Sequence, residues 1–83
     1  MEPLYIIGIS VSKREEVAIQ VQAILTKHGD NIVARFGIHD IGEEKKGLIT
    51  LNFMGGKQKA EELTEELCNI NGVQASVLEI DCA

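Results

Sequence analysis

Apolar and polar residues repeat along this chain with two different periods, and the changes of period mark the expected strands and helices. The segments "LYIIGISV" (residues 4–11) and "VQASVLEI" (residues 73–80) are rich in β-branched and aliphatic residues, which predicts a strand near each end. Residues 31–40 ("NIVARFGIHD") and 47–55 ("GLITLNFMG") alternate with period two, which predicts two further strands. The charged stretch "IGEEKKG" between them predicts a hairpin loop.

Two segments carry apolar residues at helical spacing instead. In "SKREEVAIQVQAILTKH" (residues 12–28), Ser12 and Glu15 match an S-x-x-E capping box, and Gly29 is suited to a left-handed helix end. The stretch after "GGK" predicts a second helix with its glutamates facing outward. The apolar positions that define the two helices are Val17, Val21, Ile24, Leu25, Ala60, Leu63, Leu67 and Ile70.

The order of these elements is strand, helix, strand, strand, helix, strand. This is the order of the split βαβ, or ferredoxin-like, fold. We therefore expect an α+β sandwich in which an antiparallel four-stranded sheet carries both helices on one face. A length of 83 residues leaves room for a single domain, residues 1–83.

Strand alternation predicts which side chains face the helices and which form the open face of the sheet. The expected helix-facing residues are Tyr5, Ile7, Ile9, Ile32, Ala34, Phe36, Ile38, Ile49, Leu51, Phe53, Val73, Ala75 and Val77. The expected open-face residues are Leu4, Ile6, Gly8, Ser10, Val33, Arg35, Gly37, His39, Leu48, Thr50, Asn52, Met54, Ser76, Leu78 and Ile80. This open face is half apolar, which favours a homodimer or homotetramer formed through it or through a strand edge. The alternative is a monomer with scattered surface apolar residues.

The charge and the hydropathy of the chain limit the kinds of partner that it can bind. A net charge of -5 argues against direct binding to nucleic acid, which requires a basic face. The start "MEPLYIIGIS" has no basic region or cleavage site, and no apolar run approaches the roughly 18 residues of a membrane span. We therefore expect a cytoplasmic protein that does not insert into membranes.

The chain is poor in catalytic and metal-binding groups. An iron-sulfur cluster needs about four thiolates, whereas the chain has two cysteines, and Cys68 is expected to be a semi-buried structural residue. A structural metal site needs about four ligands, whereas His28 and His39 are the only histidines. His28 is placed to cap a helix end, and His39 is either a solvated strand-end residue or a ligand. We expect no enzymatic activity and no cofactor.

One cluster near the start of the first helix has anion-binding chemistry. Helix N-terminal amides, the hydroxyls of Ser10 and Ser12, and the cations Lys13 and Arg14 could together hold an anion. The alternative is an ordinary surface turn.

The junction "ISVSKREEVAIQVQAIL" and the "INGV" before the last strand resemble ACT-type regulatory domains, which implies small-ligand binding at subunit interfaces. A closer resemblance covers nearly the whole chain. The stretches "DNIVARFGIHDIGEEKKGLITL", with Arg35 and Gly37, and "LCNINGV" are similar to the small ACT-like iron-only hydrogenase system regulators. This implies a regulatory role in a hydrogenase system.

The chain is also similar to the C-terminal domain of nickel-responsive repressors, whose second strand carries a His-x-His pair. Here His39 matches, and Gly37 stands at the other histidine position. We therefore expect a non-enzymatic regulatory or sensor module that binds a small ligand or a protein partner at subunit interfaces. The alternative is a metal-responsive module with His39 at an intersubunit site. The candidate ligand-binding or interface residues are Ser10, Ser12, Lys13, Arg14, Arg35, Gly37, His39 and Leu78.

Overall fold

The computed structural model describes residues 3–12, 14–42 and 46–81, apart from the side chains of residues 14–16 and 40–41. Its elements follow the predicted order. They are β1 (Leu4–Val11), α1 (Arg14–Lys27), a 3-10 turn η1 (Gly29–Asn31), β2 (Ile32–Ile41), β3 (Lys46–Phe53), α2 (Lys57–Cys68) and β4 (Val73–Ile80). The predicted bounds of the first and last strands are confirmed residue for residue.

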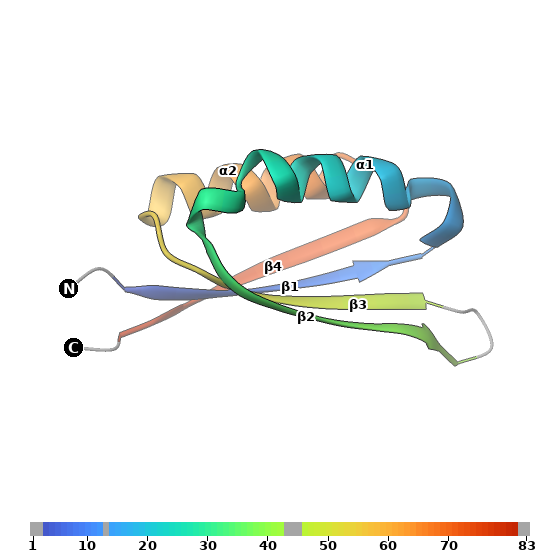
Figure 1. Cartoon of the computed structure of the whole chain (residues 1–83), viewed down its shortest axis with the longest axis horizontal. Coiled ribbons are helices and arrows are strands. Elements are labelled where there is room, and N and C mark those ends of the chain that lie inside the picture. The colour runs from blue at the N-terminus through green and yellow to red at the C-terminus, as the bar shows by residue number, and fades with distance from the viewer. Residues whose placement is uncertain (1–2, 13, 43–45, 82–83) are drawn as a thin grey trace.

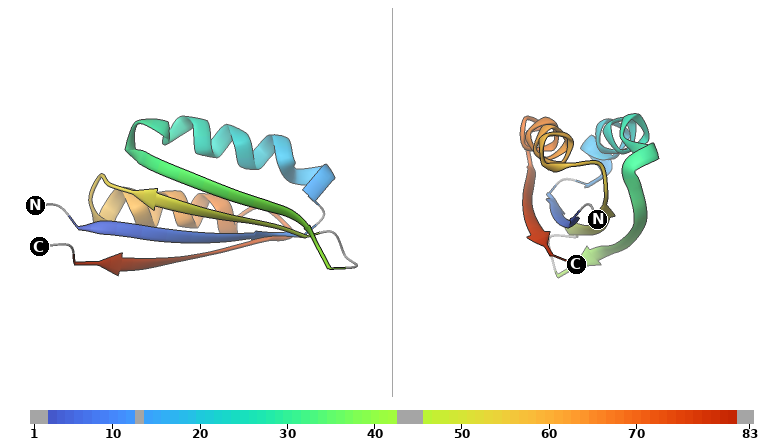
Figure 2. Two further views of the ribbon diagram at one scale, coloured as in Figure 1. Left: turned by 60° about the horizontal axis from the view of Figure 1, so that its bottom comes forward. Right: turned by 90° about the vertical axis from the view of Figure 1, so that its left-hand side faces the viewer.

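The four strands form one antiparallel sheet in the order β2-β3-β1-β4, which confirms the predicted ferredoxin-like fold. Both helices lie on the same face of this sheet (Figure 1). Seen along the strands, the sheet is strongly curved, and its edge strands β2 and β4 rise toward α1 and α2 respectively (Figure 2). No helix within the described ranges is long and apolar enough to cross a membrane.

The core lies between the two central strands, β4 and the helices. Its largest fully buried side chains are Phe53, Ile7, Ile9, Leu25, Leu51, Leu63, Leu67 and Val21. Burial of each such side chain stabilises the fold by roughly 1.5–3 kcal/mol relative to exposure. In the described part of the chain β2 contributes no fully buried side chain, and only Ile32 packs against the core from that strand.

The two helices pack on the sheet unequally. α2 lies closely along β4 and also contacts β1, whereas α1 makes only sparse contact with β2 beneath it. The helix α1 is therefore held mainly through its buried residues Val17, Val21 and Leu25 and through its contacts with α2. We call the loosely packed boundary between α1 and β2 the α1–β2 seam.

A β-bulge explains why β2 stays out of the core. Ile32 pairs with Phe53, but Ala34 pairs with Asn52, so one extra residue enters β2 at Val33. An extra residue in one strand moves every later side chain to the opposite face of the sheet. The bulge thus reverses the faces of β2 from Ala34 to Ile38, after which a second register shift follows.

The predicted faces of β2 are therefore wrong beyond the bulge. Phe36 and Ile38, expected to face the helices, pair with the open-face residues Thr50 and Leu48 and are 65% and 44% exposed. Arg35, expected on the open face, pairs with the buried Leu51 and lies on the helix side. Gly37 pairs with Ile49 and lies on the same side, and His39 lines a hollow there together with Arg35. Ala34 moves to the open face with Phe36.

Three smaller expectations also need correction or fall outside the described residues. Gly29 does not take a left-handed conformation; it begins η1, whereas Gly72 has a φ of 90° in the turn before β4. Cys68 is exposed rather than semi-buried, and its thiol donates a hydrogen bond to the carbonyl oxygen of Ala75 at 3.4 Å. The expected capping box cannot be followed because the side chain of Glu15 lies outside the description.

An ionic contact joins the end of α1 to α2. Glu66 accepts a hydrogen bond from Lys27 Nζ at 2.9 Å, and its carboxylate lies 3.3 Å from Nε2 of the largely buried His28 ring. The hydrogen bond from Lys27 lowers the pKa of Glu66 below its ordinary value of 4.5, and this outweighs the partial burial that acts to raise it. The ionised carboxylate is the stabilising form.

We expect the change Glu66→Gln to lower the free energy of unfolding by about 0.5–1 kcal/mol at neutral pH, as for other exposed ion pairs. A carboxylate with a lowered pKa contributes fully above its unfolded-state value of 4.5, and that contribution is lost as the pH falls through the lower folded-state value. Urea unfolding of both proteins at neutral pH and at about pH 3 measures this. The two stabilities should converge in acid; a gap that stays constant with pH would contradict the ionic role of Glu66.

Candidate functional site

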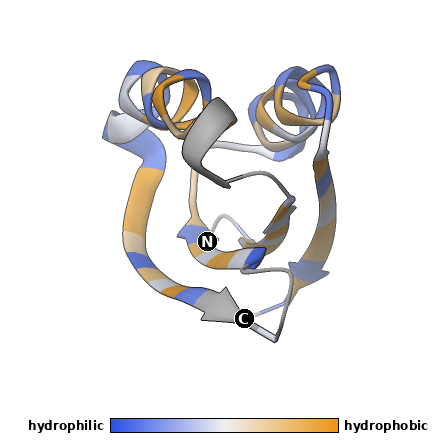
Figure 3. Ribbon diagram, turned by 90° about the vertical axis from the view of Figure 1, so that its right-hand side faces the viewer, coloured by the Kyte–Doolittle hydropathy of each residue, from blue (hydrophilic) through white to orange (hydrophobic). Residues whose placement is uncertain are grey.

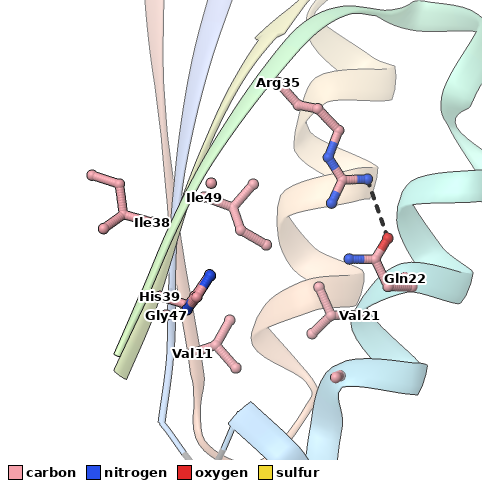
Figure 4. A pocket seen from close by; sticks show the side chains of 10 residues that line it. Val11, Val21, Gln22, Arg35, Ile38, His39, Gly47 and Ile49 are labelled. Carbon is pink, nitrogen blue, oxygen red and sulfur yellow. Dashed lines mark hydrogen bonds between the residues drawn. The ribbon is translucent and has the colours of Figure 1, made fainter. Parts of the chain in front are cut away.

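The seam between α1 and β2 contains a pocket of about 190 Å³. Its apolar wall comes from the end of β1, from α1 and from β3, through Val11, Ala18, Val21 and Ile49. Its polar groups are Arg35 and His39 on β2 and Gln22 on α1. We call this the α1–β2 pocket (Figure 4).

Small residues and the bulge together explain why space remains in the seam. Gly37 lies between Arg35 and His39 on the helix side of β2, and Ala18 presents only a methyl group from α1. The large apolar side chains of Phe36 and Ile38 are turned to the other face by the bulge, although Ile38 still borders the pocket. Figure 4 shows the Ile38 side chain on the far side of the strand from Val21.

Arg35 bridges the seam. Its Nη1 donates a hydrogen bond to Gln22 Oε1 on α1 at 3.1 Å, which Figure 4 marks as a dashed line. Arg35 also lines a second hollow beyond this bridge, bounded by Leu25, Gly29 and Ile32. The hydrogen bond between Arg35 and Gln22 therefore lies between two hollows along the α1–β2 seam.

The structure brings together three of the residues singled out from the sequence. Arg35, Gly37 and His39 all line the α1–β2 pocket, but on the helix side of the sheet rather than on its open face. Leu78 pairs with Ile6 on the open face and is separated from the pocket by the sheet. The predicted set therefore divides between two faces.

Ser10 and Ser12 lie in a different, polar hollow at the end of β1. Lys46 and the turn Asn69–Gly72 complete its wall. Lys13 lies outside the described residues, as does the side chain of Arg14. The expected anion site at the start of α1 stays a prediction.

Sequence patterns missed Gln22 and Ala18, the residues that α1 contributes to the pocket. Ala18 and Gln22 directly follow Val17 and Val21, two α1 residues that the sequence pattern assigned to the core. One weak sequence signal for a pocket was present. Ala18 and Gly37 are both small, and two small residues that line the same space leave it unfilled. That signal becomes usable only when the facing strand residue is known.

Within the described residues, no three His, Cys, Asp or Glu side chains lie close enough together to hold a metal ion. The metal-responsive alternative stays a prediction of the sequence.

The open face of the sheet is the second surface with functional character. It carries exposed large apolar side chains from β2, β3 and β4, and the strands in Figure 3 show alternating apolar and polar stripes. The exposed apolar residues on this face are Phe36, Ile38, Leu48 and Leu78, with Val33 at the bulge beside them. We call these five residues the sheet-face patch.

Comparisons with known proteins agree with this architecture. A family described as "TM1266-like: Iron-only hydrogenase system regulator, putative" matches residues 3–77. The structure of protein TM1266 from Thermotoga maritima superposes with a TM-score of 0.88 at 26% identity, covering 98% of this chain and 100% of that one. None of the curated proteins matches the chain.

More distant structures share the fold. The ACT domain of GTP pyrophosphokinase from Chlorobium tepidum has a TM-score of 0.68 at 17% identity, covering 96% of this chain and 88% of that one. The apo form of CPII, a nitrogen regulatory PII-like protein from Thiomonas intermedia, has a TM-score of 0.63 at 14% identity, covering 94% and 89% respectively. At these identities the likeness concerns the ferredoxin-like, ACT-like fold alone.

Proposed function

This chain belongs to the TM1266-like family of iron-only hydrogenase system regulators, and on that premise we propose that it is a non-enzymatic sensor module of such a system. In this proposal the chain assembles as a cytoplasmic homo-oligomer through the sheet-face patch. A small ligand or a protein partner then acts on the assembled module. The family description and the shared fold support the regulatory part of the proposal.

The observation that carries the proposed assembly is the sheet-face patch. Phe36 and Ile38 come from the edge strand β2, Leu48 pairs with Ile38 from β3, and Leu78 comes from the other edge strand, β4. Scattered exposed apolar residues are common, but a group on one sheet face usually marks an interaction site. A second copy of the same face is self-complementary, as a two-fold homodimer requires.

The size of the chain supports the same assignment. Domains of about 80 residues rarely gain more than roughly 3–5 kcal/mol from a single core and commonly add an oligomer contact. Here β2 adds no fully buried side chain to the core in the described part of the chain. Pairing of the open faces would bury Phe36 and Ile38.

We expect the change Ile38→Asp to dissociate the assembly, because it places an unpaired charge within a proposed apolar contact. The measurement is the mass by light scattering at micromolar concentration, compared with 9.1 kDa for one chain. Ile19→Asp is the matched control, since Ile19 is 85% exposed on α1 and lies away from the sheet face. A wild-type mass equal to one chain, or a mass unchanged by Ile38→Asp, would remove the proposed interface.

A further inference from the structure

The α1–β2 pocket has the size of a small-molecule site. Its volume of about 190 Å³ exceeds that of an engineered protein cavity of about 150 Å³ that binds benzene. Val11, Val21 and Ile49 supply an aliphatic wall rather than an aromatic one. The wall therefore suits a short, branched aliphatic group.

The polar groups at the pocket offer more donors than acceptors. Arg35 uses one N–H on Gln22, and a guanidinium carries five N–H donors and no acceptor. Since Gln22 accepts through its side-chain oxygen, its amide nitrogen still carries two N–H donors beside the guanidinium. None of the described side chains that line the pocket is acidic. The arrangement favours a ligand with a negatively charged acceptor at one end.

We propose that the α1–β2 pocket binds a small organic carboxylate that has a branched aliphatic body and no amino group. This rests on the proposed function as a ligand-responsive module and names the ligand class. The aliphatic body fills the space beside Val21 and Ile49, and the carboxylate accepts hydrogen bonds from Arg35. An α-amino group would find no carboxylate to pair with among the described side chains of the lining, whereas the guanidinium of Arg35 would repel an ammonium ion beside it.

Gly37 is the residue that keeps the pocket open. A Cβ built on Gly37 would meet no atom within 4 Å, and its backbone φ lies outside the left-handed region. The Cβ of a valine there would therefore meet open space beside the pocket, and valine suits a strand better than glycine does. Gly37→Val should remove the binding volume while keeping the fold.

The experiment is calorimetric titration of the full chain with three probes of matched skeleton: 4-methylpentanoate, its primary amide and leucine. We expect the carboxylate to bind about tenfold or more tightly than the amide and leucine, as a charge-assisted hydrogen bond gives. Arg35→Gln should weaken carboxylate binding by a similar factor, and Gly37→Val should abolish it. Gly29→Val is the matched control, because its added Cβ also meets no atom within 4 Å, and Gly29 neither lines the α1–β2 pocket nor lies on the open face of the sheet.

Thermal unfolding of each variant without ligand shows whether that variant is folded. The inference is overturned if wild-type protein shows no binding of 4-methylpentanoate at millimolar concentration, if leucine binds as tightly, or if folded Gly37→Val still binds. The mass by light scattering separates this failure from that of the proposed assembly. An oligomer without carboxylate binding removes the ligand class alone, whereas a monomer that binds the carboxylate removes the interface and keeps the pocket.

Discussion

Replacement of Phe53 by alanine is expected to destabilise the protein by about 3–5 kcal/mol, the usual cost of truncating a buried phenylalanine. Phe53 is 0% exposed and pairs across the sheet with Tyr5 and Ile32, so its truncation leaves a cavity inside the core. A domain of this size has only about 5 kcal/mol of stability or less from its core. Urea unfolding followed by circular dichroism should find most of Phe53→Ala unfolded at room temperature.

Phe36→Ala is the matched control, since these two are the only phenylalanines in the chain. Phe36 is 65% exposed on the sheet-face patch, so its loss should change the stability of a single chain by less than about 0.5 kcal/mol. The comparison also tests the bulge at Val33, because without it Phe36 would face the helices. Equal destabilisation by the two changes, measured at a concentration below that of assembly, would contradict the register of β2.

Gly72→Ala is expected to cost about 1–3 kcal/mol, the range for a residue held in an unfavourable backbone conformation. Gly72 has a φ of 90°, and a Cβ there would lie 3.3 Å from the carbonyl oxygen of Ser12. The carbonyl oxygen of Gly72 accepts a hydrogen bond from the Ser12 backbone N–H at 2.7 Å, so the turn cannot shift away without breaking it. Thermal unfolding should show a fall in Tm of roughly 4–8 °C for each kcal/mol lost.

Gly29→Ala provides the control for this change. Gly29 lies outside the left-handed region, and an added Cβ would meet no atom within 4 Å. Alanine there should leave the stability unchanged or raise it by up to about 1 kcal/mol, because it restricts the unfolded chain. A larger loss at Gly29 than at Gly72 would overturn the assignment of Gly72 as the strained turn position.

Much of the fold could be predicted because local patterns and global packing agree. The β-branched runs at Leu4–Val11 and Val73–Ile80 became β1 and β4, and Ala60, Leu63 and Leu67 became the buried side of α2. Each of these elements has one face packed on the core. Period and burial then carry the same information.

The candidate site was only partly predictable. Arg35, Gly37 and His39 were selected together, and they do line one pocket. Their side of the sheet was wrong, and their partners on α1, Gln22 and Ala18, were missed. Contacts between a strand and a distant helix depend on the sheet register, which no local pattern specifies.

The sequence by itself determined the order of the elements, the bounds of the two outer strands and the apolar sides of the helices, since these follow from residue spacing within each segment. Only the tertiary structure decided which way β2 faces. Alternation shows that Phe36 and Ile38 share one side and Arg35 and His39 the other, but the side itself depends on pairing with β3. One extra residue at Val33 shifts that pairing by one position. This shift places Arg35 in the α1–β2 pocket and Phe36 and Ile38 on the open face of the sheet.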